Sequence, residues 1–158
     1  MERETFPMEE MQMENLAEYC RKYTNLTAMQ TELLKRISVC FPFIADLAHA
    51  HVNVYVKANR EGQLLVVAHE KPHTIFYPAQ LTKAGTFMAK TEEPLVEYTM
   101  RTGKPMKGKR EWNWGSSLDM YTFAIHDGME VIAVVSFATN SDELNIDGYH
   151  QLLETACV

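Results

Sequence analysis

The sequence predicts a mixed α/β fold of the α+β kind, in which helices cover both sides of a central antiparallel sheet of five or six strands. One hairpin carries much of this prediction. Residues 51–58 alternate between apolar and polar, residues 64–68 are almost continuously apolar, and turn-forming residues 59–62 separate them. Because strict alternation is typical of a strand with one buried face, the polar members are expected to face away from the core: His51, Asn53, Tyr55 and Lys57.

A second hairpin is predicted near the C-terminus. Residues 118–126 and 130–138 flank Asp127-Gly128, the kind of dipeptide that most favours a two-residue hairpin turn. A short edge strand is expected at residues 87–88. The two hairpins are therefore expected to lie next to each other and to form most of the sheet.

Apolar residues spaced by three and four predict helices before the first hairpin. A ragged, Met-rich stripe covers residues 8–23, and a clearer stripe covers residues 26–47. Pro42 lies inside the second stripe and has no backbone donor, which predicts a kink or break near residues 39–41. Two residues are suitable N-caps for this second stripe, Asn25 and Thr27.

The segment between the hairpins combines a loop and a helix. Residues 71–85 contain Pro72 and Pro78, and they are expected to form a long loop across one face of the sheet. Two acidic residues and a proline then favour the start of a helix at 94–102, and Gly103 followed by a proline favours its end.

Residues 1–158 are expected to form one domain, because a chain of 158 residues with 46% hydrophobic residues can bury a substantial core. Residues 1–25 are expected to be a leader and an N-terminal helix. Residues 146–158 carry an amphipathic stripe that runs to the last residue without a capping Gly, Asn or Pro. This stripe is interpreted as the start of an exit helix that leads into a downstream domain.

Charge and cysteine content exclude several classes of function. A net charge of −6 gives no general attraction to phosphate backbones, so a nucleic-acid partner is not expected. No run of about 18 apolar residues could span a bilayer, so no membrane association is expected. Cys20, Cys40 and Cys157 are far apart and form no CxxC motif, which favours reduced thiols and a cytoplasmic protein.

No catalytic constellation is visible in the sequence. His49 and His51 form an HxH pair that could hold a metal with His69 or Asp46, but polar residues at a sheet end explain it better, so no metal is expected. A ligand pocket could lie between the sheet and the loops 71–85 and 112–117. The aromatic or amphipathic residues that could line it are His69, Tyr77, Trp112, Trp114, Tyr121 and Phe123. Ordinary packing beneath loops explains these side chains equally well.

Five segments together resemble a known family. Their order and spacing resemble the GAF-like N-terminal sensor domain of soluble bacterial two-component histidine kinases. The segments are CRKYTNLT (20–27), FIADLAHAHV (43–52), LLVVAHEKPHT (64–74), EEPLVEYTMRTGKP (92–105) and VIAVVSFATN (131–140). The resemblance covers roughly residues 16–140, and it implies a GAF/PAS-like sheet. It does not extend to residues 112–117, and it is weak in the middle of the crossing loop.

The resemblance implies a parent protein in which a PAS domain and the kinase parts follow this domain. ATP would bind only in the kinase part, so this chain is expected not to be an enzyme and to hold no known cofactor apart from an unknown small ligand. A homodimer and a response regulator are the partners that the resemblance implies.

Three functions remain open at this point. The first is a sensory input domain that passes a small-molecule or redox cue through its exit helix. The second is a ligand-free dimerisation scaffold with residues 8–23 and 146–158 at the seam. The third is a GAF-fold redox enzyme such as a sulfoxide reductase, which needs a reactive cysteine pair.

Overall fold

The fold is a six-stranded antiparallel sheet with helices on both faces, as the sequence predicts. The computed structural model describes residues 8–73, 83–113 and 116–139. Across the sheet the strands follow the order β3-β2-β1-β6-β5-β4. Their bounds are β1 His51–Lys57, β2 Gln63–Glu70, β3 Phe87–Ala89, β4 Met106–Asn113, β5 Ser116–Asp127 and β6 Glu130–Thr139.

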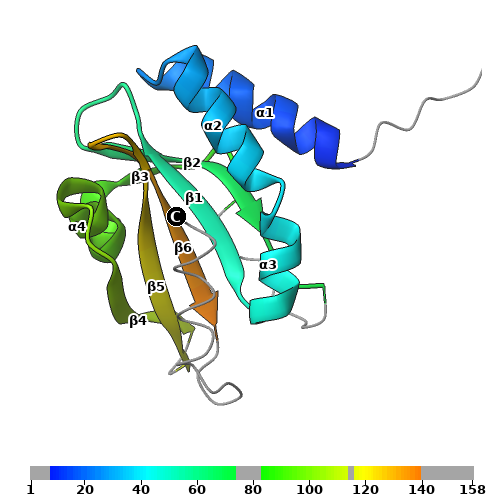
Figure 1. Ribbon diagram of the computed structural model, residues 1–158. Helices are drawn as coiled ribbons and strands as arrows, with labels where there is room; N and C mark the ends of the chain where they lie inside the picture. Colours follow the sequence, from blue (N-terminus) through cyan, green and yellow to red (C-terminus); the bar gives the residue numbers. More distant parts are fainter. Residues whose placement is uncertain (1–7, 74–82, 114–115, 140–158) are drawn as a thin grey trace, which may run out of the picture.

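Helices α1 (Met8–Tyr23), α2 (Ala28–Ser38) and α3 (Phe41–Ala48) lie on one face of the sheet (Figure 1). A capping box starts α2, because the Thr27 hydroxyl accepts from the Gln30 backbone N–H and the Gln30 side chain accepts from the Thr27 N–H. The predicted break near Pro42 is confirmed, since α2 ends before Val39 and α3 begins with Pro42 in its first turn.

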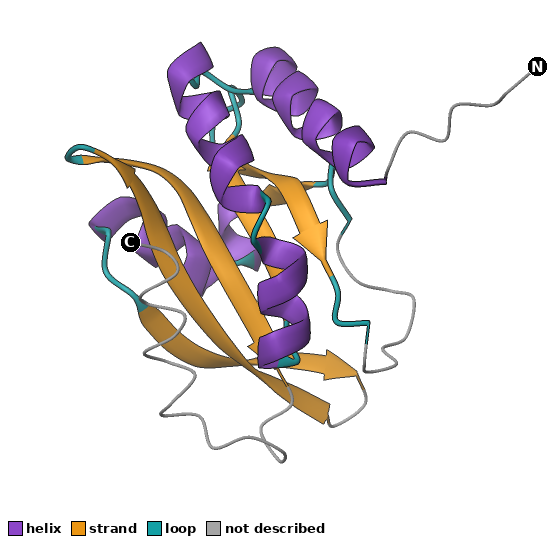
Figure 2. Ribbon diagram, turned by 45° about the vertical axis from the view of Figure 1, so that its right-hand side comes forward, coloured by secondary structure: helices purple, strands orange, loops and turns teal. Residues whose placement is uncertain are grey.

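The opposite face carries α4 (Pro94–Thr102), which follows the short 3₁₀ helix η1 (Lys90–Glu92). Figure 2 shows α4 behind the sheet and α1 to α3 in front of it. Gly103 ends α4 in the left-handed conformation with φ 72°, which confirms the stop predicted there. Within the described residues, no helix is long and apolar enough to cross a membrane.

Both predicted hairpins are present, and they are adjacent. β1 pairs with β2, and β5 pairs with β6 across the Asp127-Gly128 turn. Strands β1 and β6 then join the two hairpins along the centre of the sheet, with His51 opposite Ala138 and Tyr55 opposite Val134. The short strand β3 is an edge strand, as predicted, and β4 forms the other edge.

One prediction about β1 is wrong, because both faces of this strand are buried. All its residues except Lys57 are buried, including the polar His51 and Asn53. Two neighbouring strands flank β1, and Tyr55, on the face that the alternation left open, belongs to an apolar cluster that includes α4. The apolar members of that α4-side packing are Tyr55, Leu64, Val66, Val96, Met100, Met120 and Val134.

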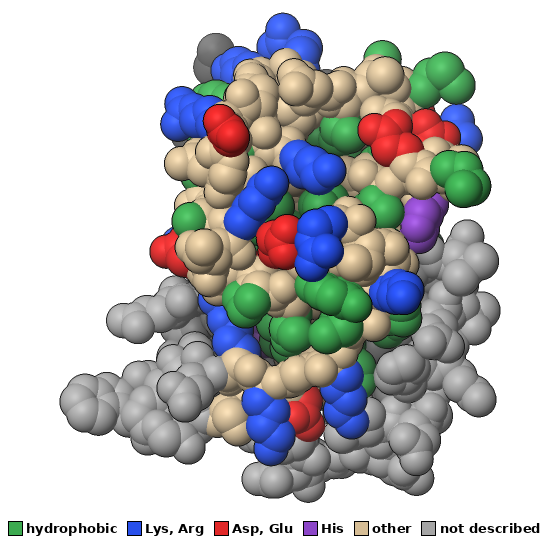
Figure 3. Space-filling model, turned by 90° about the vertical axis from the view of Figure 1, so that its left-hand side faces the viewer, with side chains coloured by type: hydrophobic (Ala, Val, Ile, Leu, Met, Phe, Trp, Pro, Cys, Tyr) green, Lys and Arg blue, Asp and Glu red, His purple; other side chains and the backbone are tan. Residues whose placement is uncertain are grey.

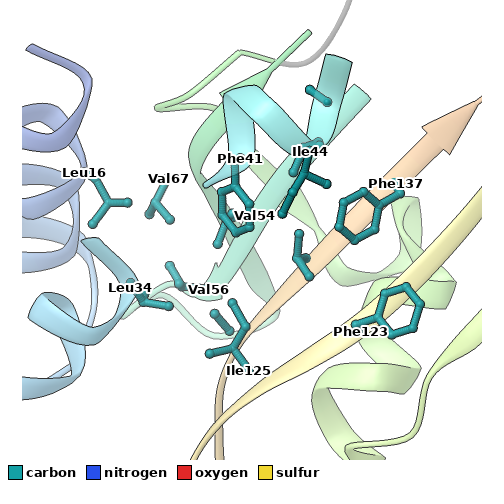
Figure 4. Close-up of a cluster of buried hydrophobic side chains, with 14 of the residues drawn as sticks. Leu16, Leu34, Phe41, Ile44, Val54, Val56, Val67, Phe123, Ile125 and Phe137 are labelled. Atoms are coloured by element: carbon teal, nitrogen blue, oxygen red, sulfur yellow. The ribbon is translucent and has the colours of Figure 1, made fainter. Parts of the chain in front are cut away.

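The larger core lies between the sheet and helices α1 to α3 (Figure 4). Leu16 from α1 and Leu34 from α2 reach toward Val56 and Val67 on the sheet, while Phe41 and Ile44 come from α3. Burying side chains of this size stabilises the fold by about 1.5–3 kcal/mol each. The expected leader at residues 1–7 and the expected exit helix at 146–158 lie outside the described residues.

The side of the molecule that carries α4 has Lys and Arg spread over it, with acidic side chains between them (Figure 3). Hydrophobic side chains gather in a shallow hollow in the lower half of this view.

Gly108 of β4 lies under α4, and a Cβ atom there would come within 2.7 Å of Leu95 Cδ1. Strand β4 and helix α4 are therefore packed closely.

Candidate functional site

A row of polar side chains crosses four adjacent strands on the α4 face of the sheet. His69 of β2 lies opposite Asn53 of β1, Asn53 lies opposite Ser136 of β6, and Ser136 lies opposite Thr122 of β5. Asn53, Ser136 and Thr122 are all buried, and His69 is half-buried. We call His69, Asn53, Ser136 and Thr122 the polar row.

The His69 end of the polar row is tightly arranged. His69 Nδ1 lies 2.6 Å from Asn53 Oδ1, and an amide oxygen can only accept, so the imidazole Nδ1–H donates. In the neutral ring this leaves Nε2 as an acceptor. The ring of His51, one pleat along β1, stacks on His69 with 5.8 Å between centroids and 17° between planes. Two imidazoles therefore share this end of the sheet.

Both imidazoles are held in the neutral form. Burial lowers the pKa of His51 to about 4, with further lowering by His69 and Lys71. Burial also lowers the pKa of His69, and Lys71 adds to this effect. At neutral pH the pair therefore presents uncharged hydrogen-bonding groups to its surroundings.

Helix α4 covers the neighbouring part of the same face. The hydroxyls of Thr99 and Thr122 are 2.6 Å apart, so the helix is hydrogen-bonded to the end of the polar row. Burial raises the pKa of the Tyr55 hydroxyl to about 12, and Glu93 raises it further, against the lowering influence of Arg110, Ser136 and Asn53. The α4 face thus combines an apolar half beneath the helix with a polar half beside it.

The structure separates the residues predicted to line a pocket. His69 belongs to the polar row, whereas Tyr121 and Phe123 belong to the core on the α1–α3 side of the sheet. Phe123 packs edge-on against Phe137 at 5.8 Å between centroids, and Lys107 Nζ lies 5.5 Å from the centre of the Tyr121 ring. The structure therefore does not bring these two aromatics to His69.

Strand alternation is the reason for this separation. Successive residues of β5 point to opposite faces, so Thr122 faces α4 while Tyr121 and Phe123 face the other helices. Trp112 belongs to β4, and Tyr77 and Trp114 lie outside the described residues.

Sequence reasoning did not identify Asn53, Ser136 or Thr122 as site residues. Asn53 falls on the polar side of an alternating strand, a position that favours exposure over a role in a buried site. Ser136 and Thr122 stand out only as single polar residues within long apolar strands, which is a weak signal. Strand register, which brings distant residues together, supplies the missing information.

The HxH pair does not form a joint metal site with its neighbours. His49 caps α3 with a left-handed backbone, φ 48°, while His51 lies inside β1. Across residues 8–73, 83–113 and 116–139, no group of three or more His, Cys, Asp or Glu side chains could hold a metal ion.

The described cysteines differ in their surroundings. Cys20 is buried in α1, whereas Cys40 is exposed at the junction of α2 and α3. Burial raises the pKa of the Cys20 thiol to about 11, so this thiol stays protonated at neutral pH.

Comparison with known proteins adds the family to this geometry. A family model described as the GAF domain of the histidine kinase PdtaS matches residues 16–153, most of the chain. This chain belongs to that family of GAF domains. No curated protein sequence matches it.

Solved structures share the GAF domain's fold at low sequence identity. The sensor region of a sensor histidine kinase is 20% identical with a TM-score of 0.66, over 89% of this chain and 50% of that one. A GAF domain/HD domain protein from Geobacter sulfurreducens is 13% identical with a TM-score of 0.55, over 80% of this chain and 85% of that one.

An IclR homolog from Microbacterium hydrocarbonoxydans, solved in complex with 4-hydroxybenzoate, is 10% identical with a TM-score of 0.56, over 80% of this chain and 65% of that one. At these identities the structures support the fold. The GAF domain spans about half the length of the sensor region that it resembles.

Proposed function

We propose that this GAF domain is the signal-input part of a histidine kinase, and that it binds a small molecule beside α4, over the polar row. The observation that carries this proposal is the burial of Asn53, Ser136 and Thr122 on a sheet face whose other half is apolar. Burying polar groups costs free energy unless they are hydrogen-bonded, and a polar half-face next to an apolar one is typical of a binding surface.

The ligand proposed here is small and hydrogen-bonding. Neutral His69 and His51 and the amide of Asn53 offer directional donors and acceptors, while Tyr55 and the residues beneath α4 offer apolar contact. The IclR homolog solved in complex with 4-hydroxybenzoate supports a ligand of about this size, because part of that protein has a similar fold. A ligand with one aromatic ring and polar substituents would contact the apolar half of this face with its ring and the polar half with its substituents.

We propose that the output passes through residues 146–158 into downstream PAS and kinase domains in the cytoplasm. ATP would bind in the kinase part, and the parent kinase would act as a homodimer that phosphorylates a response regulator. The GAF domain itself would carry out no reaction. Ligand binding would bias the kinase only as far as the ligand prefers one conformation of the domain.

Mass spectrometry of the purified chain tests ligand binding. The wild-type chain should release a small molecule on denaturation, and Asn53→Leu should release much less because the buried hydrogen-bonding partner of His69 is lost. Asn25→Leu is the matched control, since Asn25 is exposed and far from the polar row along the chain. Circular dichroism would check that both variants remain folded.

The result that contradicts ligand binding is equally definite. If the wild-type chain releases nothing and no metabolite mixture raises its melting temperature, the polar row has no ligand. A large loss of stability in Asn53→Leu, with no molecule released by the wild-type chain, would assign the row a purely structural role.

The dimerisation scaffold is a second candidate function, and one observation favours it. Phe43 and Leu47 lie four residues apart on α3 and are 70% and 40% exposed, and Val39, in the turn before α3, is 61% exposed. Exposed apolar side chains gathered in this way are typical of a protein contact. Light scattering should show a dimer that Phe43→Glu dissociates, whereas Met129→Glu, at an exposed hairpin turn, should leave it intact. A monomeric wild-type chain would contradict this function.

A redox enzyme receives less support. Such an enzyme needs a reactive thiolate beside a second cysteine, and burial keeps the Cys20 thiol protonated. Turnover of methionine sulfoxide by the purified chain would reverse this conclusion.

A further inference from the structure

A separate cavity lies on the other side of the sheet, between α1, the junction of α2 and α3, and the end of β2. Its volume is about 160 Å³. Leu16, Phe41 and Val67 form its inner wall, and all three are almost fully buried. Ser38, Val39 and Ala84 lie at its rim. Figure 4 shows Leu16 and Val67 facing each other across the space between α1 and the sheet.

Two local irregularities build this cavity. The chain turns between α2 and α3 at Val39 and Cys40, so no continuous helix fills the space above the sheet. Below it, β2 contains a β-bulge, because Val54 pairs with Ala68 and Tyr55 pairs with Val66. Val67 is the extra residue, and a bulge of this kind redirects side chains locally. The break between α2 and α3 and the bulge in β2 therefore both border the cavity, through Val39 and Val67.

The dimensions of the cavity restrict its occupant. An engineered protein cavity of about 150 Å³ with apolar walls binds benzene, so a space of this size accepts one six-membered ring. A peptide helix, about 10 Å across with its side chains, cannot enter it. A linear polar metabolite would leave the apolar wall uncovered.

We propose that this cavity binds a small, uncharged, monocyclic aromatic molecule of the size of phenol. The ring would lie against Leu16, Phe41 and Val67, and its polar substituent would point to the rim at Ser38. The cavity lies on the α1–α3 side of the sheet, and His69 is the one member of the polar row that also lines it.

The lining selects against anions. Among the described residues that line the cavity, none is Lys or Arg, and the one residue with an acidic side chain is Glu70. Burial lowers the pKa of His69, which also lines the cavity and is therefore no source of positive charge. A benzoate anion would lose its hydration without gaining a cation. Phenol and benzoate, which share the ring, should therefore be clearly distinguished.

A titration of the full 158-residue chain with phenol tests the proposal. Two-dimensional ¹H–¹⁵N spectra should show saturable shifts of the amides of Leu16, Ser38 and Val67. Benzoate should bind at least tenfold more weakly. Ala84→Leu should abolish the shifts by filling the rim, and Ala84→Ser is the matched control, because Ala84 is exposed and neither change disturbs the core. Ser38→Leu fills the rim from the opposite side.

Other outcomes would overturn the proposal. Shifts that do not saturate, or that persist in both Ala84→Leu and Ser38→Leu, would show that the cavity is not the site. Shifts confined to Asn53 and Ser136 would instead place phenol at the polar row. Ser136→Ala changes a member of the polar row that does not line the cavity, and it should leave phenol binding unchanged, so the two sites can fail separately.

Discussion

Glu93 Oε1 lies 2.7 Å from Arg110 Nη1, and this ion pair joins the start of α4 to the edge strand β4. The Glu93 side chain is 3% exposed and that of Arg110 is 37% exposed, so water reaches only one partner. Burial raises the pKa of Glu93, and the guanidinium of Arg110 opposes that rise. The carboxylate therefore depends on Arg110 to remain charged inside the fold.

Arg110→Ala should destabilise the domain by about 3 kcal/mol in urea unfolding, because it leaves a buried carboxylate without its cation. Glu93→Gln should cost only about 1 kcal/mol, since the remaining guanidinium can turn toward solvent. The double variant should resemble Glu93→Gln alone. A loss in the double variant equal to the sum of the two single losses would show that the pair is not coupled.

Stability should fall as the pH is lowered through the range in which His51 titrates. The folded-state pKa of His51 is about 4, below its ordinary 6.5, so the unfolded chain binds the proton more tightly. The contribution is complete above about pH 6.5 and lost as the pH falls toward 4, by at most about 3 kcal/mol. Lowering of the His69 pKa acts in the same direction.

His51→Phe should flatten this part of the pH profile of the free energy of unfolding, since it removes the titrating ring. His126→Phe is the control, because His126 is exposed near the hairpin turn. A His51→Phe profile as steep as that of the wild type would assign the pH dependence to other groups.

Gln30→Glu should destabilise the domain by about 2 kcal/mol at pH 7. Gln30 Nε2 donates to Asp127 Oδ2 at 3.2 Å and to Glu130 Oε2 at 3.1 Å, so a glutamate there would put a third carboxylate beside two others. Repulsion among the three carboxylates would favour their protonation. The loss of stability should therefore shrink as the pH falls toward and below about 4.5.

Gln30→Met is the matched comparison for this position, because it removes the hydrogen bonds without adding charge. Thermal unfolding of this variant should show a loss of about 1 kcal/mol that does not depend on pH in the same range. A pH-independent loss for Gln30→Glu as well would contradict the electrostatic explanation.

Gly103→Ala should be more destabilising than Gly62→Ala, although both glycines have nearly the same backbone conformation, φ 72° and 73°. Gly62 has open space around it, so its substitution should cost about 1 kcal/mol of left-handed strain. A Cβ at Gly103 would also meet His126 Nε2 at 3.0 Å. Chemical denaturation of both variants measures the difference, and equal losses would mean that His126 moves away freely.

Much of the fold could be predicted because its signals are local. The turn at Asp127-Gly128, the break at Pro42 and the end of α4 at Gly103 each depend on a few neighbouring residues. The alternation within β1 does not by itself reveal that both faces of this strand are buried, since cover on the second face comes from elements far away in the chain. Alternation shows which residues of a strand are polar, but in β1 the polar residues His51 and Asn53 are buried.

The candidate site was less predictable for a related reason. Alternation in β5 shows that Tyr121 and Thr122 face opposite ways, but it does not show which of them shares a face with His69. Only the pairing of β1 with β6 and of β6 with β5 decides this question. The ligand-binding role of His69 remains a prediction, and the roles of Tyr77 and Trp112 remain predictions as well.

The pairing of β1 with β6 also has a kinetic consequence. Each hairpin closes a short turn and can form on the microsecond timescale. Their joining brings together residues such as His51 and Ala138, which are far apart in the chain, so much loop entropy is lost before the central contacts form. Substitutions along this pairing, such as Val54→Ala, should therefore slow folding more than equally destabilising substitutions within the β1–β2 turn.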